Sequence, residues 1–112
     1  MASIFTKIVK REIPAEVYYE DHLCMAIKDI NPAAPSHAII FPKKEIASMD
    51  DASEEDRELL GHCLLKAVEV ATQLRLKNGY RLVINTKADG GQTVFHLHIH
   101  ILGGRPMEWP PG

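Results

Sequence analysis

The sequence predicts an α+β fold in which helices lie on one side of a five-stranded antiparallel sheet. Apolar residues at three-four spacing indicate one long helix in the second half of the chain. Short apolar segments separated by turn residues indicate strands, and their short connections favour antiparallel pairing. A strict alternation of side-chain types near the C-terminus is typical of a strand. The predicted strands are 17–20, 24–30, 37–41, 80–85 and 94–102.

A short amphipathic helix is expected at the N-terminus. Ile4, Phe5, Ile8 and Val9 fall on one helical face, whereas the basic residues fall off it. The helix ends before the pair at 13–14, because a proline disfavours helical geometry in the residue that precedes it.

The long helix follows an acidic run between residues 50 and 56. Such a run could hold a cation, but a helix N-terminus explains it better, since acids complement the helix dipole and Ser53 is a good N-cap. The helix is expected to continue to about Leu76, before Asn78 and Gly79 end it. Its predicted core stripe consists of Leu60, Leu64, Ala67, Val68, Ala71 and Leu74.

Length and composition exclude several classes of protein. The 112 residues suit a single domain, 1–112, with a C-terminal tail at 103–112. Thirteen Lys and Arg against fifteen Asp and Glu leave no basic footprint for nucleic acid, and no apolar run approaches the length of a membrane span. Cys24 and Cys63 are expected to be reduced core residues. The absence of a readable secretory signal makes a cytoplasmic location the expectation.

Three histidines alternate with apolar residues near the C-terminus. Side chains alternate across a strand, so His96, His98 and His100 are expected to share one face. Imidazole is the usual side chain for proton transfer at neutral pH. Mutual repulsion predicts a row of neutral and cationic rings, in which a neutral ring acts as a nucleophile while its neighbour binds an anion. Leu97, Ile99 and Ile101 are expected on the other face, in the core.

A metal site is the main alternative for these histidines. His96 and His100 lie roughly 13 Å apart along a straight strand at ~3.3 Å per residue, so one zinc could take only two neighbouring rings. His37 is the other candidate ligand, and no carboxylate or cysteine adjoins the motif. The sequence therefore predicts neither a metal nor another cofactor.

The segment before the histidines favours a phosphate ligand. Residues 89–93, Asp-Gly-Gly-Gln-Thr, offer flexible backbone N–H groups together with the amide of Gln92 and the hydroxyl of Thr93. Asn85, at the end of the preceding predicted strand, adds a possible donor. Alone the segment is a turn, but directly before three histidines it indicates a nucleotide or phosphoryl site.

At this point the sequence resembles the histidine-triad (HIT) superfamily of nucleotide hydrolases and transferases. The signature is residues 91–102, Gly-Gln-Thr-Val-Phe-His-Leu-His-Ile-His-Ile-Leu. The flanking segments 5–8, 29–37, 103–106 and 109–112 resemble the Hint branch of that superfamily. The resemblance extends over essentially the whole chain.

The resemblance implies homodimers in which two sheets join into one of ten strands. It implies binding of purine nucleoside monophosphates such as AMP, and hydrolysis of adenosine 5′-phosphoramidates and acyl-AMP. His98 would attack the α-phosphorus to form a transient AMP–histidine, and water would release AMP. His100 would contact the phosphate oxygens, with His96 and His37 as supporting histidines.

The resemblance also implies the contacts to the rest of the substrate. Asp29 would hold the ribose hydroxyls, and Trp109 would reach toward the partner subunit's site. The phosphate-side contacts would be Asn85, Gly91, Thr93 and Val94, and the apolar slot for the base would be formed by Phe5, Ile8 and Ile30.

Two other functions remain open at this stage. A non-catalytic nucleotide sensor or scaffold could use the same pocket, but a binder would not need the nucleophile that His98 provides. A dinucleoside polyphosphate hydrolase would share the glycine-glutamine lead-in to the motif, and the continuation Gly-Gly-Arg-Pro at 103–106 argues against it.

Overall fold

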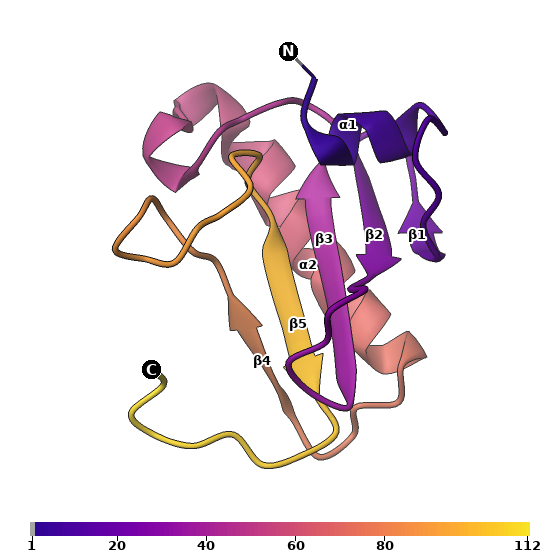
Figure 1. The fold of residues 1–112 in the computed structure, drawn as a ribbon, viewed down its shortest axis with the longest axis vertical. Helices are drawn as coiled ribbons and strands as arrows, with labels where there is room; N and C mark the ends of the chain where they lie inside the picture. The colour runs from indigo at the N-terminus through magenta and orange to yellow at the C-terminus, as the bar shows by residue number, and fades with distance from the viewer. Residues whose placement is uncertain (1) are drawn as a thin grey trace.

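The computed structural model describes residues 2–112 and confirms the predicted fold class. Five strands form one sheet in the order β1-β2-β3-β5-β4, and every neighbouring pair is antiparallel. The long helix α2 covers one face of the sheet, whereas the short helix α1 lies over one end of the other face (Figure 1). The elements are α1 Ile4–Val9, β1 Val17–Glu20, β2 Cys24–Lys28, β3 Ser36–Pro42, η1 Met49–Asp51, η2 Glu54–Asp56, α2 Arg57–Gln73, β4 Tyr80–Val83 and β5 Ile99–Gly103.

The α2 face of the sheet carries most of the hydrophobic core. Strand alternation sends small and β-branched side chains from β2, β3 and β5 toward the helix. The helix contributes short side chains there, so it packs closely on the sheet. The buried residues of this cluster are Cys24, Ala26, Ala38, Ile40, Cys63, Ala67, Val70, Ala71, Ile99 and Ile101.

The opposite face holds a second apolar cluster at one end and polar side chains beyond it. Phe5 and Ile8 of α1 pack on this cluster, and the Phe5 ring stacks on Phe41 with centroids 4.5 Å apart. Ser3 caps α1, because its side-chain oxygen accepts a hydrogen bond from the backbone N–H of Thr6. The remaining members of the cluster are Met25, Ile27 and Ile39.

The last strand begins five residues later than the sequence predicts. The alternation suggested a strand over 94–102, but β5 starts at Ile99. The Leu97 N–H bonds to the Ile46 carbonyl at 2.7 Å, and this contact draws the chain before Ile99 toward the end of β3. β4 likewise ends at Val83 rather than residue 85, and β2 ends at Lys28 rather than residue 30. β3 is longer than predicted, since it includes Ser36 and Pro42.

The predicted stripe of α2 is partly wrong. Ala67 and Ala71 are buried, but Leu64 and Val68 are 40% and 43% exposed, and Val70 is buried in their place. The helix is rotated relative to the predicted stripe, because the sheet accepts the small side chains at close approach. It also ends at Gln73, three residues before the predicted end.

The start of the long helix follows the prediction more closely. Ser53 and Asp56 form a capping box on the short turn η2, which leads directly into α2. Asp56 is buried and pairs with Lys44 at 2.6 Å. Cys24 and Cys63 are buried free thiols, as predicted. Within residues 2–112, no helix is long and apolar enough to cross a membrane.

Candidate active site

His98 presents one open ring nitrogen. Its Nδ1 lies 2.6 Å from the backbone carbonyl of His96, and a carbonyl only accepts, so Nδ1 carries the proton. In the neutral ring Nε2 then holds a lone pair. His98 Nε2 makes no hydrogen bond within the chain. Since every buried side-chain nitrogen or oxygen in residues 2–112 has a hydrogen-bond partner, Nε2 is not a buried atom and is open to solvent. The edge of the ring is supported by Phe5, at 5.0 Å between centroids.

His37 and His100 form a hydrogen bond whose direction is fixed from outside. The Ala33 N–H donates to His37 Nδ1 at 2.9 Å, so the proton of the neutral His37 ring lies on Nε2. His37 Nε2 is 2.8 Å from His100 Nδ1 and donates to it. The neutral His100 ring therefore keeps its own proton on Nε2. Its centroid lies 4.9 Å from that of His98, so the ring that carries this N–H donor is the neighbour of the His98 ring.

Burial favours the neutral forms of three of the four rings. Desolvation lowers the pKa of His37 and of His96 below the ordinary value. Burial, followed by the neighbouring rings of His98 and His37, lowers the pKa of His100 to about 4. Removal from water thus outweighs the nearby carboxylate of Asp29 and favours the neutral form of His100.

His96 lies below the surface and not in an open row. It precedes β5, its side chain is fully buried, and Phe5 and Phe41 both meet it edge-on. Its Nε2 donates to the Pro42 carbonyl at 2.7 Å, and its Nδ1 lies 2.6 Å from Ser3 Oγ. His96 and His98 both meet the Phe5 ring, and the His98 ring meets that of His100, so the three histidines share one face as predicted, with His96 at its buried end. Leu97, Ile99 and Ile101 are buried, also as expected.

The loop before the histidines is closed by the side chain of Gln92. Its oxygen accepts from the Lys87 N–H at 2.8 Å, and its nitrogen donates to the carbonyls of Ala47 and Val94 at 2.6 and 3.1 Å. The Gln92 amide is thus engaged with the backbone of the protein itself. The loop also requires Gly90, since a Cβ there would lie 2.4 Å from the Thr86 carbonyl oxygen.

The HIT domain family matches residues 10–107 of this chain. The chain belongs to the HIT domain family. An uncharacterized HIT-like protein of Synechocystis is 59% identical over 110 residues, which cover 98% of this chain and 96% of that protein. A 14 kDa zinc-binding protein of Zea mays is 49% identical and is covered over 88% of its length, with 98% of this chain aligned.

Solved HIT structures have the same fold. A HIT family hydrolase from Legionella pneumophila superimposes with a TM-score of 0.96 at 48% identity, covering 99% of this chain and all of the other. A histidine triad nucleotide-binding protein from Candida albicans superimposes with a TM-score of 0.82 at 27% identity, covering 97% of this chain and 83% of the other. The predicted fold and superfamily are thereby confirmed.

In this HIT domain the predicted ribose and base residues differ in burial and in partners. Asp29 Oδ2 is 3.3 Å from His37 Nε2, while its Oδ1 accepts from the Asn31 N–H. Ile30 is 86% exposed and lines a shallow cavity of about 350 Å³ together with Asp29. Phe5 and Ile8 are almost fully buried against the sheet. Phe5 therefore contacts His98, and Asp29 contacts His37, whereas the side chain of Ile30 remains exposed to solvent.

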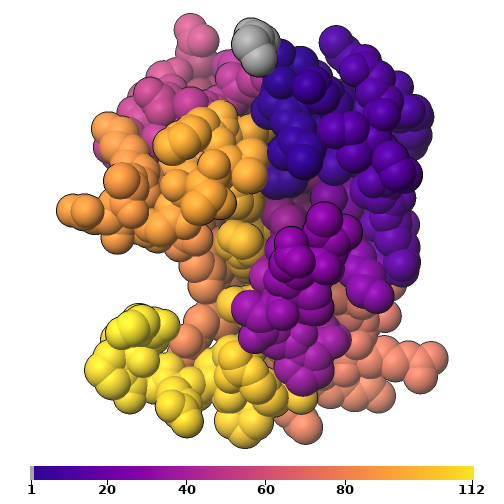
Figure 2. All heavy atoms as spheres, in the orientation of Figure 1, coloured from indigo at the N-terminus to yellow at the C-terminus, as the bar shows by residue number. Residues whose placement is uncertain are grey.

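The C-terminal tail of the HIT domain bounds a larger hollow. Arg81 of β4 donates to the Glu108 carbonyl at 2.7 Å and holds the tail beside that strand. A cavity of about 590 Å³ lies between the tail and the sheet, and its lining includes Asn85. In Figure 2 it is part of the notch between the orange loop and the yellow tail. Trp109 is 83% exposed in the single chain, so its ring is not covered by the rest of that chain.

The other predicted phosphate-side residues lie in the loop that precedes the histidines. Thr93 is exposed, and Val94 is half-buried against the cluster that contains Phe5. Both line a cavity of about 470 Å³ beside the start of α1. Gly91 has a φ of +83°, which a residue with a side chain adopts only under strain.

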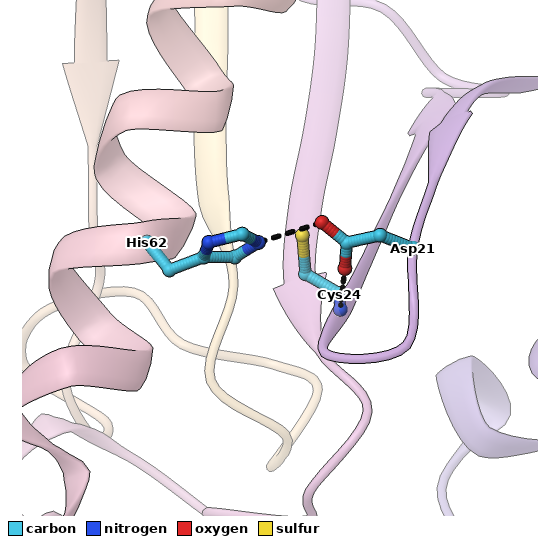
Figure 3. A group of neighbouring side chains, drawn as sticks. All are labelled: Asp21, Cys24 and His62. Atoms are coloured by element: carbon cyan, nitrogen blue, oxygen red, sulfur yellow. Dashed lines mark hydrogen bonds and ion pairs between the residues drawn. The ribbon is translucent and has the colours of Figure 1, made fainter.

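A second polar cluster lies on the α2 side of the sheet. Asp21, Cys24 and His62 converge between the β1–β2 turn and α2 (Figure 3). The Asp21 carboxylate accepts four hydrogen bonds, which use its full acceptor capacity. The donors are the N–H groups of Leu23 and Cys24, the Tyr19 hydroxyl and His62 Nε2. The cluster is therefore a closed set that ties the helix to the turn. Sequence reasoning missed this cluster, because Asp21 and His62 lie 41 positions apart.

Proposed function

We propose that this chain is a nucleoside phosphoramidase, which hydrolyses adenosine 5′-phosphoramidates and acyl-AMP through an AMP–histidine intermediate. The observation that carries the proposal is the hydrogen bond from His98 Nδ1 to the His96 carbonyl. It leaves the lone pair of Nε2 open to solvent, which is the state a nucleophilic imidazole requires.

The reaction would proceed in two displacements. His98 Nε2 attacks the α-phosphorus, the P–N bond breaks, and the amine leaves with a proton taken from water. The ring becomes cationic while it carries AMP, and the His96 carbonyl, which accepts its Nδ1–H, stabilises that charge. Water then attacks the phosphorus, neutral His98 leaves, and AMP is released. Splitting one difficult phosphoryl transfer into two steps lowers both barriers.

The neighbouring histidines would stabilise charge on the phosphate. His100 carries its proton on Nε2, because Nδ1 accepts from His37, and that N–H can donate to a non-bridging oxygen. Asp29 would accept from the ribose hydroxyls, since its carboxylate is partly exposed beside His37. The roles of Asn85, Gly91, Thr93 and Val94 on the phosphate side, and of Phe5, Ile8 and Ile30 around the base, remain part of this proposal.

The relatives support hydrolysis and nucleotide binding in general. The Legionella pneumophila relative is named a hydrolase, and the Candida albicans relative is named a nucleotide-binding protein. The P–N bond as the point of cleavage rests on the resemblance of the flanking segments to the Hint branch.

The proposal includes a homodimer. β4 lies at an edge of the sheet, so pairing along β4 would extend five strands to ten. The outer face of α2 exposes Leu64, Leu65 and Val68, which a partner could cover. Because Arg81 holds the tail beside β4, Trp109 would then reach the partner subunit.

A single-turnover reaction tests the proposed activity. The protein in excess is mixed with an AMP-linked amine, quenched in base, and examined by intact mass and peptide mapping. We expect an AMP adduct on His98 and release of the amine, with neither in His98→Asn. Tight binding of AMP without adduct or amine release would assign the protein to the nucleotide sensors. Faster cleavage of a dinucleoside polyphosphate than of the phosphoramidate would assign it to that class of hydrolase.

A further inference from the structure

The first turn of α1 contacts the buried histidine directly. Ser3 Oγ lies 2.6 Å from His96 Nδ1, a contact between residues 93 positions apart in the chain. Since His96 Nε2 donates to the Pro42 carbonyl, Nδ1 of the neutral ring is an acceptor. Ser3 Oγ must therefore donate its hydrogen to His96, while it accepts the Thr6 N–H as the cap of the helix.

Glu45 holds this turn from the other side. Its Oε1 accepts from the Ser3 N–H at 2.6 Å and from the Thr6 hydroxyl at 2.7 Å. These two hydrogen bonds lower the pKa of Glu45 to about 2, so the carboxylate is ionised at neutral pH. Ser3 is thus fixed through both its backbone and its side chain.

The next residue along the chain holds the histidine-bearing backbone. The Ile46 carbonyl accepts the Leu97 N–H at 2.7 Å, on the peptide that follows His96. The ring of His96 and the peptide after it are therefore both anchored to the segment at 42–46. The His96 carbonyl lies between these two anchors, and it is the group that accepts the Nδ1–H of His98.

We propose that Ser3 and Glu45 are positioning residues for the nucleophile, acting through His96. Ser3 fixes the tautomer and the rotation of the His96 ring, and Glu45 fixes Ser3. Together they aim the His96 carbonyl at His98 Nδ1, which selects the tautomer with an open Nε2. This inference rests on the proposed function for its catalytic consequence, but its structural part concerns the proton position on His98 alone.

Two substitutions at Ser3 separate its roles. Glycine is tolerated at an N-cap with little loss of helix stability. Ser3→Gly therefore leaves α1 largely intact but removes the donor to His96. Ser3→Thr keeps both the cap and the hydroxyl, so it serves as the rescue variant. Glu45→Ala tests the second link, and Glu12→Ala is its matched control, because Glu12 is an exposed glutamate beyond the end of α1.

The first measurement is the tautomer of the histidine rings, read from ¹⁵N shifts and long-range ¹H–¹⁵N correlations of the labelled full chain. We expect His98 in the wild type and in Ser3→Thr to be protonated on Nδ1. In Ser3→Gly we expect a mixture with the Nε2–H form. If the spectrum of Ser3→Gly shows His98 protonated on Nδ1 alone, as in the wild type, the proposal is overturned.

The second measurement is the rate of adduct formation in the single-turnover reaction. Ser3→Gly leaves a buried acceptor without its donor, so we expect the rate to fall about tenfold or more. AMP affinity should stay within about threefold, corresponding to ~0.7 kcal/mol. Glu45→Ala should show a smaller loss of rate, and Glu12→Ala none. A loss of affinity equal to the loss of rate would assign Ser3 to binding instead. If the wild type forms no adduct, the proposed function fails, and the tautomer measurement still decides the positioning role.

Discussion

His37 donates a hydrogen bond to His100 over 2.8 Å, and the Ala33 N–H determines its direction. Without that amide, either ring could be the donor. With it, the protons of both neutral rings are assigned, and His100 keeps an N–H on the nitrogen that faces away from His37. A backbone group in the loop after β2 thus specifies a donor beside His98.

The first prediction concerns stability against pH. The pKa values of His37, His96 and His100 are lower in the folded chain than the ordinary value of about 6.5. The unfolded chain therefore binds more protons just below pH 6.5, so the free energy of unfolding decreases as the pH falls toward about 4. Each pKa unit by which a ring is lowered contributes on the order of 1.4 kcal/mol to this decrease in the free energy of unfolding. Urea denaturation between pH 7 and pH 4 measures the slope.

A histidine variant shows whether the buried rings cause this pH dependence of the free energy of unfolding. His100→Asn removes one of the depressed groups, so its stability should depend less on pH between pH 6.5 and pH 4 than that of the wild type. Carboxylates with lowered pKa values, such as Asp21 and Glu45, also begin to lose their stabilising ionisation below about pH 5. They are present in both proteins, so the difference between the two slopes belongs to His100. A wild-type stability that is constant from pH 7 to pH 5 would contradict the neutral assignment of the buried histidines.

The second prediction concerns the nucleophile. His98→Asn removes Nε2 and leaves the His96 carbonyl, the His37–His100 pair and the loop in place. We expect AMP affinity within about tenfold of the wild type, or ~1.4 kcal/mol, and no measurable turnover. Calorimetric titration with AMP and a steady-state assay provide the two values. Turnover at the wild-type rate in this variant would exclude His98 as the nucleophile.

The parts of the fold that rest on local pattern could be predicted from the sequence. The Ser53 cap, the turns and the succession of strands along the chain depend on residues close together in the sequence. The start of β5 could not, because the alternation at 96–101 fits both a strand and the observed segment. The hydrogen bond from Leu97 to the Ile46 carbonyl decides between them, and it joins residues 51 positions apart.

The same distinction holds for the site. The histidines were evident as residue types, but their protonation states depend on burial and on partners distant in sequence. The Ser3–His96 contact had one sequence signal, the helix-capping position of Ser3 before Ile4. Nothing in the sequence linked that cap to a histidine at the other end of the chain.

The third prediction concerns the cluster of Figure 3. Asp21→Asn replaces one acceptor oxygen by an NH2 donor and removes the charge, so the side chain can no longer accept all four hydrogen bonds. We expect a loss of about 2–4 kcal/mol in the free energy of unfolding. Asp50→Asn is the matched control, because its ion pair with Lys87 is exposed and should contribute less than about 1 kcal/mol. Equal stability of the two variants would show that the cluster does not hold α2.

The fourth prediction compares two neighbouring glycines. In Gly90→Ala the new Cβ would lie 2.4 Å from the Thr86 carbonyl oxygen, so the loop must open. In Gly91→Ala the site has room but φ is +83°, which costs roughly 1–2 kcal/mol. We expect the loop amides to exchange with deuterium faster in Gly90→Ala than in Gly91→Ala. We also expect the rate of adduct formation to fall further in Gly90→Ala. The reverse order would mean that backbone strain, and not the Thr86 contact, determines the loop.

The fifth prediction concerns assembly. Leu65 and Val68 lie on one face of α2 and are 68% and 43% exposed, outside the core of their own chain. The double variant Leu65→Glu, Val68→Glu should therefore fold normally, while two charges on each copy oppose association through that face. Light scattering at micromolar concentration should give about twice the chain mass of 12.5 kDa for the wild type and the single mass for the variant. Val17→Glu, at the other sheet edge and 40% exposed, is the control that should stay dimeric. A dimer that is lost in Val17→Glu but kept in the double variant would place the interface at β1, and Trp109, held beside β4 by Arg81, would then not reach the partner's site.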